Sequence, residues 1–126
     1  MWRIIAIGLC WVWGLGGLTA GAAEEADLRL HTVPNPFKAG YTDARLVYFL
    51  PDAGAVTITI FDRDGDLVRT VAENFRRAEG PQKGQDSWDG RDDGGALVAP
   101  GLYVIVLEVK IGGDVLRDTF NCVVER

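Results

Sequence analysis

Val56-Thr57-Ile58-Thr59-Ile60 is the stretch that decides the fold of this 126-residue chain. Its apolar and polar side chains alternate strictly, and successive residues of a β-strand point to opposite faces with that same period of two. We therefore expect the three aliphatic side chains to lie in a core and the two threonines to face away from it.

Short β-rich runs separated by glycine, proline and aspartate continue on both sides of this strand, and no window has a convincing helical period. Asp62-Arg63-Asp64-Gly65 predicts a hairpin turn, because Asp-Gly supplies the positive φ that tight turns require. Residues 72–84 are polar and contain glycine and proline, so we expect a mobile connection there. The expected strands are residues 28–33, 45–50, 56–60, 66–71, 85–88, 101–110 and 115–124. About seven short strands favour an all-β fold, an immunoglobulin-like or fibronectin-III-like β-sandwich.

The first 22 residues are typical of a secretory signal peptide. Arg3 gives a short basic start, residues 4–18 are almost entirely apolar and uncharged, and a string of small residues then precedes two glutamates. The apolar run is too short to span a bilayer comfortably. We expect cleavage after Ala22 or Ala23 and export to the periplasm, the cell surface or the medium. A transmembrane anchor left in place, or a lipoprotein modified at Cys10, is the alternative.

Charge indicates which class of partner to exclude, and cysteine content indicates whether the domain has an internal disulfide. The chain has 13 basic and 18 acidic residues, a formal net charge of −5, and Arg76-Arg77 is its one basic pair. Binding to a phosphate backbone needs clustered lysine and arginine, so we expect no nucleic-acid partner. Cys122 remains alone once the signal peptide is removed, which excludes an internal disulfide. We expect it to be a small buried hydrophobe, with an intermolecular disulfide as the alternative.

Four motifs follow one another along the chain. They are Val33-Pro34-Asn35-Pro36-Phe37, Ile58-Thr59-Ile60-Phe61-Asp62 with Gly65, Trp88-Asp89-Gly90-Arg91-Asp92 with Gly94, and Gly101-Leu102-Tyr103. In this order they resemble the FlgD-type Ig-like domain, which closes the flagellar hook-cap scaffold protein and has relatives among secretion-sorting modules of exported bacterial proteins. After the signal peptide expected at 1–22 and a short linker at 23–27, the resemblance implies an Ig-like domain at 28–126.

The resemblance implies structural roles for the motif residues. Phe37 is expected to be an aromatic plug held by a rigid loop, Trp88 the large central core residue, and Tyr103 the start of a core-facing strand. Four glycines are expected where turns need backbone freedom, namely Gly65, Gly90, Gly94 and Gly101. None of these is a catalytic or cofactor position in the family, so the resemblance implies a non-enzymatic module without a cofactor.

Two departures from the family bear on function. The hook-cap scaffold carries its assembly role in a long N-terminal portion, which we do not expect in this chain, and it is exported without a cleaved signal peptide. Sorting modules normally follow a much larger cargo domain, and we expect none before this module. We therefore expect no direct role in hook assembly.

Side chains capable of nucleophilic chemistry are few. A Ser–His–Asp triad would need Ser87 and His31, but Ser87 sits beside Trp88 in an expected strand and lacks a nucleophile-elbow motif. Cys122 and His31 form a conceivable pair because first and last strands can be neighbours, yet separate structural roles are expected. No His/Cys cluster has zinc spacing. We expect no enzyme.

Asp62, Asp64 and Asp66 alternate around Gly65 and superficially resemble the opening of a calcium loop. Such a loop needs glycine at its sixth position and glutamate at its twelfth, whereas glycine is fourth here and Glu73, the twelfth residue, follows an expected strand. A second acidic group surrounds Trp88 and belongs to a turn of the family. It comprises Asp86, Asp89, Asp92 and Asp93. We expect solvated turns and no metal, with a Ca²⁺ site as the alternative.

The strand over residues 102–107 is apolar on both faces. If Tyr103, Ile105 and Leu107 fill the core, Val104 and Val106 point outward beside the outward side of the strand at 56–60. A contiguous apolar patch there would be a docking face for another protein. This candidate partner face comprises Thr57, Thr59, Phe61, Val104 and Val106. We predict an exported module that binds another envelope or extracellular protein, with a structural or secretion-accessory subunit as the alternative.

Overall fold

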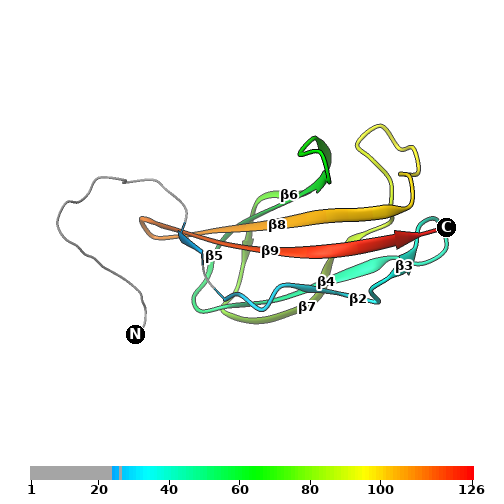
Figure 1. Ribbon diagram of the computed structural model, residues 1–126. Helices are drawn as coiled ribbons and strands as arrows, with labels where there is room; N and C mark the ends of the chain where they lie inside the picture. Colours follow the sequence, from blue (N-terminus) through cyan, green and yellow to red (C-terminus); the bar gives the residue numbers. More distant parts are fainter. Residues whose placement is uncertain (1–23, 26) are drawn as a thin grey trace.

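The computed structural model describes residues 24–25 and 27–126, and that part of the chain forms nine β-strands (Figure 1). The predicted signal peptide and its cleavage positions lie outside the described residues. No helix capable of crossing a membrane occurs among residues 24–25 and 27–126. The strands are β1 (Glu24–Glu25), β2 (His31–Val33), β3 (Phe37–Lys38), β4 (Ala44–Leu50), β5 (Gly54–Asp62), β6 (Leu67–Arg77), β7 (Gly80–Trp88), β8 (Gly101–Ile111) and β9 (Asp114–Glu125).

The strands form two sheets that face each other. The large sheet has the order β1-β9-β8-β5-β6, with β3 also pairing β9, and the small sheet has the order β2-β4-β7. Figure 1 shows β8 and β9 lying along one side of the sandwich and β2, β4 and β7 along the other. The turn between β8 and β9 and the C-terminus lie at opposite ends. This arrangement is the Ig-like sandwich that the motifs predicted.

The core lies between the sheets and is centred on Trp88, which has no exposed surface. The Trp88 ring packs edge-on against Phe37 at 5.5 Å and against Tyr103 at 5.4 Å between ring centroids. Aromatic rings prefer this geometry because the positive edge of one meets the negative face of the other. Along β5, Val56, Ile58 and Ile60 are fully buried and alternate with half-buried residues on the other face.

Gly90 follows Trp88 and brings two backbone segments together. Its φ is +82°, and a Cβ atom there would lie 2.4 Å from the Cβ of Ala39. Both the left-handed backbone and the close approach require glycine. Gly90 therefore lets the loop after β7 pass directly against the residue that follows β3.

Three features differ from the sequence-based expectation. Residues 72–84 are not a mobile connection, because β6 continues to Arg77 and β7 begins at Gly80. No residue of β6 beyond Ala72 is buried, and register shifts interrupt the pairing of β6 with β5. This part of the strand therefore lacks the alternation of buried and exposed side chains by which a strand is predicted from sequence. The strand expected over residues 28–33 is shorter than predicted, because β2 contains only His31–Val33. The two-residue strands β1 and β3, both parallel to β9, were not expected, and with them the described residues form nine strands where about seven were predicted.

Candidate functional site

The candidate partner face lies on the outer side of the large sheet, where β5 and β8 are neighbours. Thr59 pairs with Val106 and Phe61 pairs with Val104, while Thr57 lies opposite Glu108. The five predicted residues therefore occupy one face of two adjacent strands.

Val106 is an exception to the expected exposure. It is only 7 % exposed, so the expectation that it would be available at the surface is wrong. It lies on a central strand, with Thr59 of β5 on one side and Thr119 of β9 on the other. Directly opposite side chains in a sheet lie close enough to shield one another from solvent.

The exposed apolar surface of this face is an apolar band that runs across four strands near the β5–β6 turn. Leu67 of β6 pairs with Phe61, and Leu102 of β8 pairs with Val123 of β9. Leu67 is 53 % exposed, and Leu102 and Val123 are 38 % and 39 % exposed. We define the apolar band as Phe61, Leu67, Leu102, Val104 and Val123.

Sequence reasoning missed three members of the apolar band. Leu102 belongs to the strand that is apolar on both faces, and continuing the outward positions of that strand by two residues would have included it. Leu67 and Val123 become neighbours of the band only through strand pairing. No local signal in the sequence identifies that pairing.

The Asp62 turn uses its carboxylate for the backbone. Asp62 Oδ1 accepts the amide N–H groups of Asp64 and Asp66, both at 2.9 Å, and Gly65 has a φ of +90°. This is an Asx-type turn in which the side chain satisfies backbone donors. Among the residues that the structure describes, no three His, Cys, Asp or Glu side chains gather in a way that could hold a metal ion.

The acidic residues after Trp88 fasten the β7–β8 connection to the sandwich. Asp89 pairs with Arg69 of β6 at 3.2 Å, and Trp88 Nε1 donates to the carbonyl oxygen of Arg91 at 2.9 Å. The expectation for Gly94 is wrong, because the left-handed residue of this turn is Gly95, with a φ of +91°. Because Gly94 and Gly95 are adjacent, the sequence alone does not show which of them adopts the left-handed conformation.

The candidate nucleophiles and their bases are not brought together. Cys122 is fully buried, its thiol accepts a hydrogen bond from Thr32 at 3.6 Å, and burial raises its pKa. His31 Nδ1 donates instead to the carbonyl oxygen of Arg29 at 2.8 Å. Ser87 is exposed on β7 opposite Arg45. A protonated, buried thiol away from a base is not an activated nucleophile.

The expectation of a solvated turn is wrong for Asp86, which lies in β7 and belongs to a charged cluster buried between the sheets. Asp86 is 5 % exposed, and its carboxylate accepts hydrogen bonds from Arg77 at 2.8 Å and from the Tyr48 hydroxyl at 2.7 Å. Burial, reinforced by the bond to Asp86, raises the pKa of Tyr48, so the phenol stays protonated and keeps donating. The bond to Asp86 raises the pKa of Arg77. The Asp86 carboxylate accepts two hydrogen bonds, whereas the buried Arg77 Nε has no partner among the described residues; the cluster connects β6, β7 and β4.

Comparison with known proteins agrees with this architecture. A family model described as the FlgD Ig-like domain matches residues 39–113. Two solved structures from Porphyromonas gingivalis are similar in fold. Dimeric latent PorU has a TM-score of 0.59 at 19 % identity, and the match covers 75 % of this chain and 9 % of that one.

The second is PorZ, described as an essential bacterial surface component of the type-IX secretion system. Its TM-score is 0.50 at 18 % identity, and the match covers 87 % of this chain and 13 % of PorZ. The chain thus spans a small part of either protein, and the likeness concerns the fold. No curated protein matches the sequence significantly.

Proposed function

Because the chain belongs to the FlgD Ig-like domain family, we propose that it is an exported, non-enzymatic Ig-like module that binds another protein of the cell envelope or of an extracellular assembly. The family supplies the scaffold, and a scaffold by itself does not specify a function. The proposal therefore rests on the surface of this particular chain.

The observation that carries the proposal is the apolar band. Single exposed aliphatic side chains are ordinary, but here five apolar residues from four adjacent strands lie near one end of one face. Burying such a surface against a partner removes apolar area from water, which stabilises a complex. The neighbouring outward residues Thr59, Thr119 and Asn121 supply a polar border of the kind that surrounds interface cores.

A second candidate is a structural or secretion-accessory subunit that acts by assembly. The observation that favours it is the likeness in fold to a segment of PorZ, a surface component of a secretion system. Both candidates use protein contacts. They differ in whether the partner is a separate ligand or a neighbouring subunit of a large assembly, which the size of the purified native complex distinguishes.

Export is part of the proposal and has its own test. The basic start, the apolar run and the small residues before Glu24 support cleavage. Mass spectrometry of protein isolated from the envelope or the medium should find an N-terminus at Ala23 or Glu24. Recovery of the intact N-terminus at Met1 would contradict it.

The binding test places charge on the apolar band at Val104 and on its polar border at Thr59. Thr59→Glu with Val104→Lys should abolish cross-linking to the partner seen with wild-type protein, because a desolvated apolar contact does not accept unpaired charge. The matched control is Ala55→Lys with Val115→Glu, which adds the same charges to both sides of Lys110 at the other end of the same sheet. Equal partner recovery with both variants would refute the apolar band as the contact surface.

A further inference from the structure

The outer face of the small sheet differs in charge from the rest of the molecule. The chain carries a net charge of −5, yet the charged residues directed outward from β4 and from β7 are cationic, and β2 directs no acidic residue outward. Arg45 lies on β4 and Lys83 on β7, and Arg29 precedes β2 alongside them. We call this surface, with His31 and the apolar residues between the cations, the cationic face.

The one carboxylate on these three strands is turned away from the cationic face. Asp86 is buried on the core side, where Arg77 and Tyr48 satisfy it. Asp43 and Glu79 directly precede β4 and β7, and Asp89 directly follows β7. Asp27 lies beside Arg29, whose backbone amide donates to Asp27 Oδ1 at 3.1 Å. Arg45 and Lys83 form no ion pair within 4.0 Å among residues 24–25 and 27–126. Their charge is available to a partner.

The cations are distributed one to each row of side chains that crosses the sheet. In the first row Arg29 lies over the Phe49 ring, 5.4 Å from its centroid, and Phe49 pairs with Pro81. In the second row His31, Val47 and Lys83 lie side by side, and in the third Val33, Arg45 and Ser87 do so. Each row therefore combines a cation with an apolar or small neighbour.

A bulge in β7 separates the second row from the third and opens a shallow hollow. The pairing shifts between Leu46 and Val47, which leaves Gly84 and Gln85 without partners on β4. The hollow is lined by Arg45, Pro81, Lys83, Gly84 and Gln85. Gly84 has a φ of +136°, and a Cβ there would lie 3.8 Å from Arg45 Cδ.

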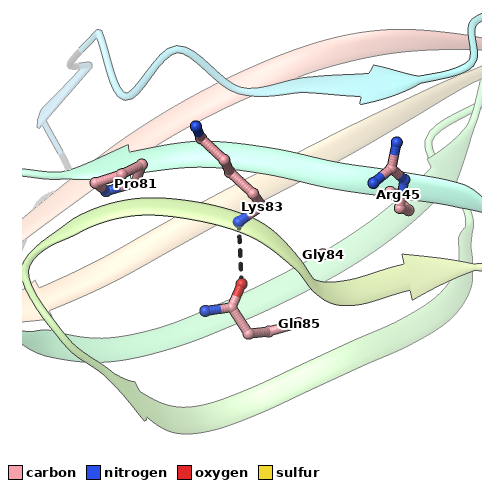
Figure 2. A pocket seen from close by; sticks show the side chains of 5 residues that line it. All are labelled: Arg45, Pro81, Lys83, Gly84 and Gln85. Carbon is pink, nitrogen blue, oxygen red and sulfur yellow. Dashed lines mark hydrogen bonds between the residues drawn. The ribbon is translucent and has the colours of Figure 1, made fainter.

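Figure 2 shows the Arg45 and Lys83 side chains extending in the same direction from neighbouring strands, while the Gln85 side chain turns the other way. The Lys83 amide donates to Gln85 Oε1 at 3.0 Å, which holds the bulge in shape. The two cations thus line the hollow, and neither forms an ion pair with another side chain of the described residues.

The row spacing suggests the form of the ligand. Rows on one face of a sheet are two residues apart, which is roughly 6.6–6.8 Å, and this is also the repeat of same-side residues in an extended peptide. A peptide with a carboxylate at every second position presents its charges at the spacing at which the rows present theirs. Val33, Val47 and Phe49 lie one in each row and offer apolar surface beside the cations.

We propose that the cationic face binds an extended acidic segment of a partner protein, one that carries carboxylates at alternate positions. This contact is independent of the apolar band, because the two surfaces lie on the outer sides of opposite sheets. A module with both contacts joins two partners across the thickness of one domain.

The test uses two labelled synthetic decapeptides of equal composition, one alternating glutamate and valine and one with five of each in blocks. Fluorescence anisotropy at low salt should show saturable binding of the alternating peptide to the folded domain, weakened at higher salt because exposed charges are screened. Arg45→Glu with Lys83→Glu should weaken binding by at least about tenfold, through loss of attraction and added repulsion.

The control variant Arg76→Glu with Lys110→Glu makes the same charge change at two exposed positions that flank Ala55 on the other sheet. It should bind the alternating peptide like wild type. Thr59→Glu with Val104→Lys should also bind like wild type, so failure of the proposed function is distinguishable from failure here.

Four results would overturn the inference. They are absence of saturable binding by wild type, equal weakening by the two charge-reversal variants, equal affinity for the block peptide, and sedimentation with phosphatidylserine vesicles without peptide binding. The last would assign the cationic face to a membrane surface instead. Circular dichroism melting verifies that each variant is folded.

Discussion

Residues 62–66 and residues 92–96 form the same turn twice, in two different settings. In each, the leading aspartate, Asp62 or Asp92, accepts the amide N–H groups two and four residues later through Oδ1, at 2.9–3.0 Å. In each, the backbone of that aspartate also bonds the residues three and four positions on. The fourth residue is a glycine with a φ of +90° or +91°.

The two turns differ in what surrounds them. The Asp62 turn joins adjacent strands of one sheet; Asp62 itself pairs with Tyr103 of β8, and residues 63–66 form no backbone hydrogen bond outside the turn among the described residues. The Asp92 turn belongs to the connection from one sheet to the other. Asp93 N donates to Val68 O at 3.0 Å, and Asp93 Oδ1 accepts from Thr70 N at 3.1 Å, so the connection is fastened along β6. The same local chemistry thus serves as a plain hairpin in one place and as a bridge between sheets in the other.

The largest effect is expected from removing Trp88, the core residue that is hydrogen-bonded to Arg91 directly before the Asp92 turn. Trp88→Ala should lower the free energy of unfolding by about 3–5 kcal/mol, because it empties the centre of the core and also removes the bond to Arg91. Denaturant titration measures it. Tyr41→Ala, at an aromatic side chain that is 80 % exposed, is the matched control and should be nearly neutral. A melting temperature for Trp88→Ala close to that of wild type would contradict the assigned core.

The second test removes the same carboxylate from each turn. Asp92→Ala should destabilise by about 2 kcal/mol and Asp62→Ala by about 1 kcal/mol, because loss of the first also loosens the attachment to β6. Chemical denaturation of both variants gives the difference. Asp62→Asn and Asp92→Asn keep the accepting oxygen and should each recover most of the loss. Equal costs for the two alanine variants would remove the distinction between the turns.

The third test asks whether the turns are locally equivalent. Gly65→Ala and Gly95→Ala should each cost about 1–2 kcal/mol, since both impose a left-handed backbone on a residue with a side chain. Neither position has an atom within 4 Å of the added Cβ, so strain is the only contribution. The two costs should agree within about 0.5 kcal/mol in the same unfolding experiment. A clear difference between the two costs would show that contacts outside the turn alter the backbone strain within it.

The smallest effect concerns calcium. Both leading carboxylates already accept two backbone donors through one oxygen, and the aspartates do not have calcium-loop spacing. We therefore expect no change in melting temperature between millimolar Ca²⁺ and excess chelator. Specific binding to the native state would raise stability by several kcal/mol at saturation, so a clear upward shift would contradict this prediction.

The sequence predicted best what depends on neighbouring residues. The alternation at 56–60 identified the strand whose three aliphatic side chains are fully buried, and Asp-Gly at 64–65 identified the turn after it. The four ordered motifs identified the family and the sandwich. The alternation, the turn and each single motif are contained in short stretches of sequence.

What the sequence did not predict depends on partners far along the chain. Val106 is covered because β8 lies between two other strands, and Leu67 joins the apolar band through its pairing with Phe61. The Asp86 cluster forms between residues of two sheets, so no spacing of residues along the sequence predicts it. The cationic face emerges only when the register of three strands places their outward cations in successive rows.

The attachment of the first residues of the domain to its last strand has a kinetic consequence. The amide groups of Leu28 and Leu30 donate to Asp118, residues 90 and 88 positions away, and β3 pairs in parallel with the end of β9. Contacts of such long sequence separation form late and slowly. A chain still emerging from a ribosome lacks β9 and has nothing against which to close its beginning. Closure of the sandwich must then wait until the C-terminal residues are free, so the domain completes its fold only after the whole chain has been made.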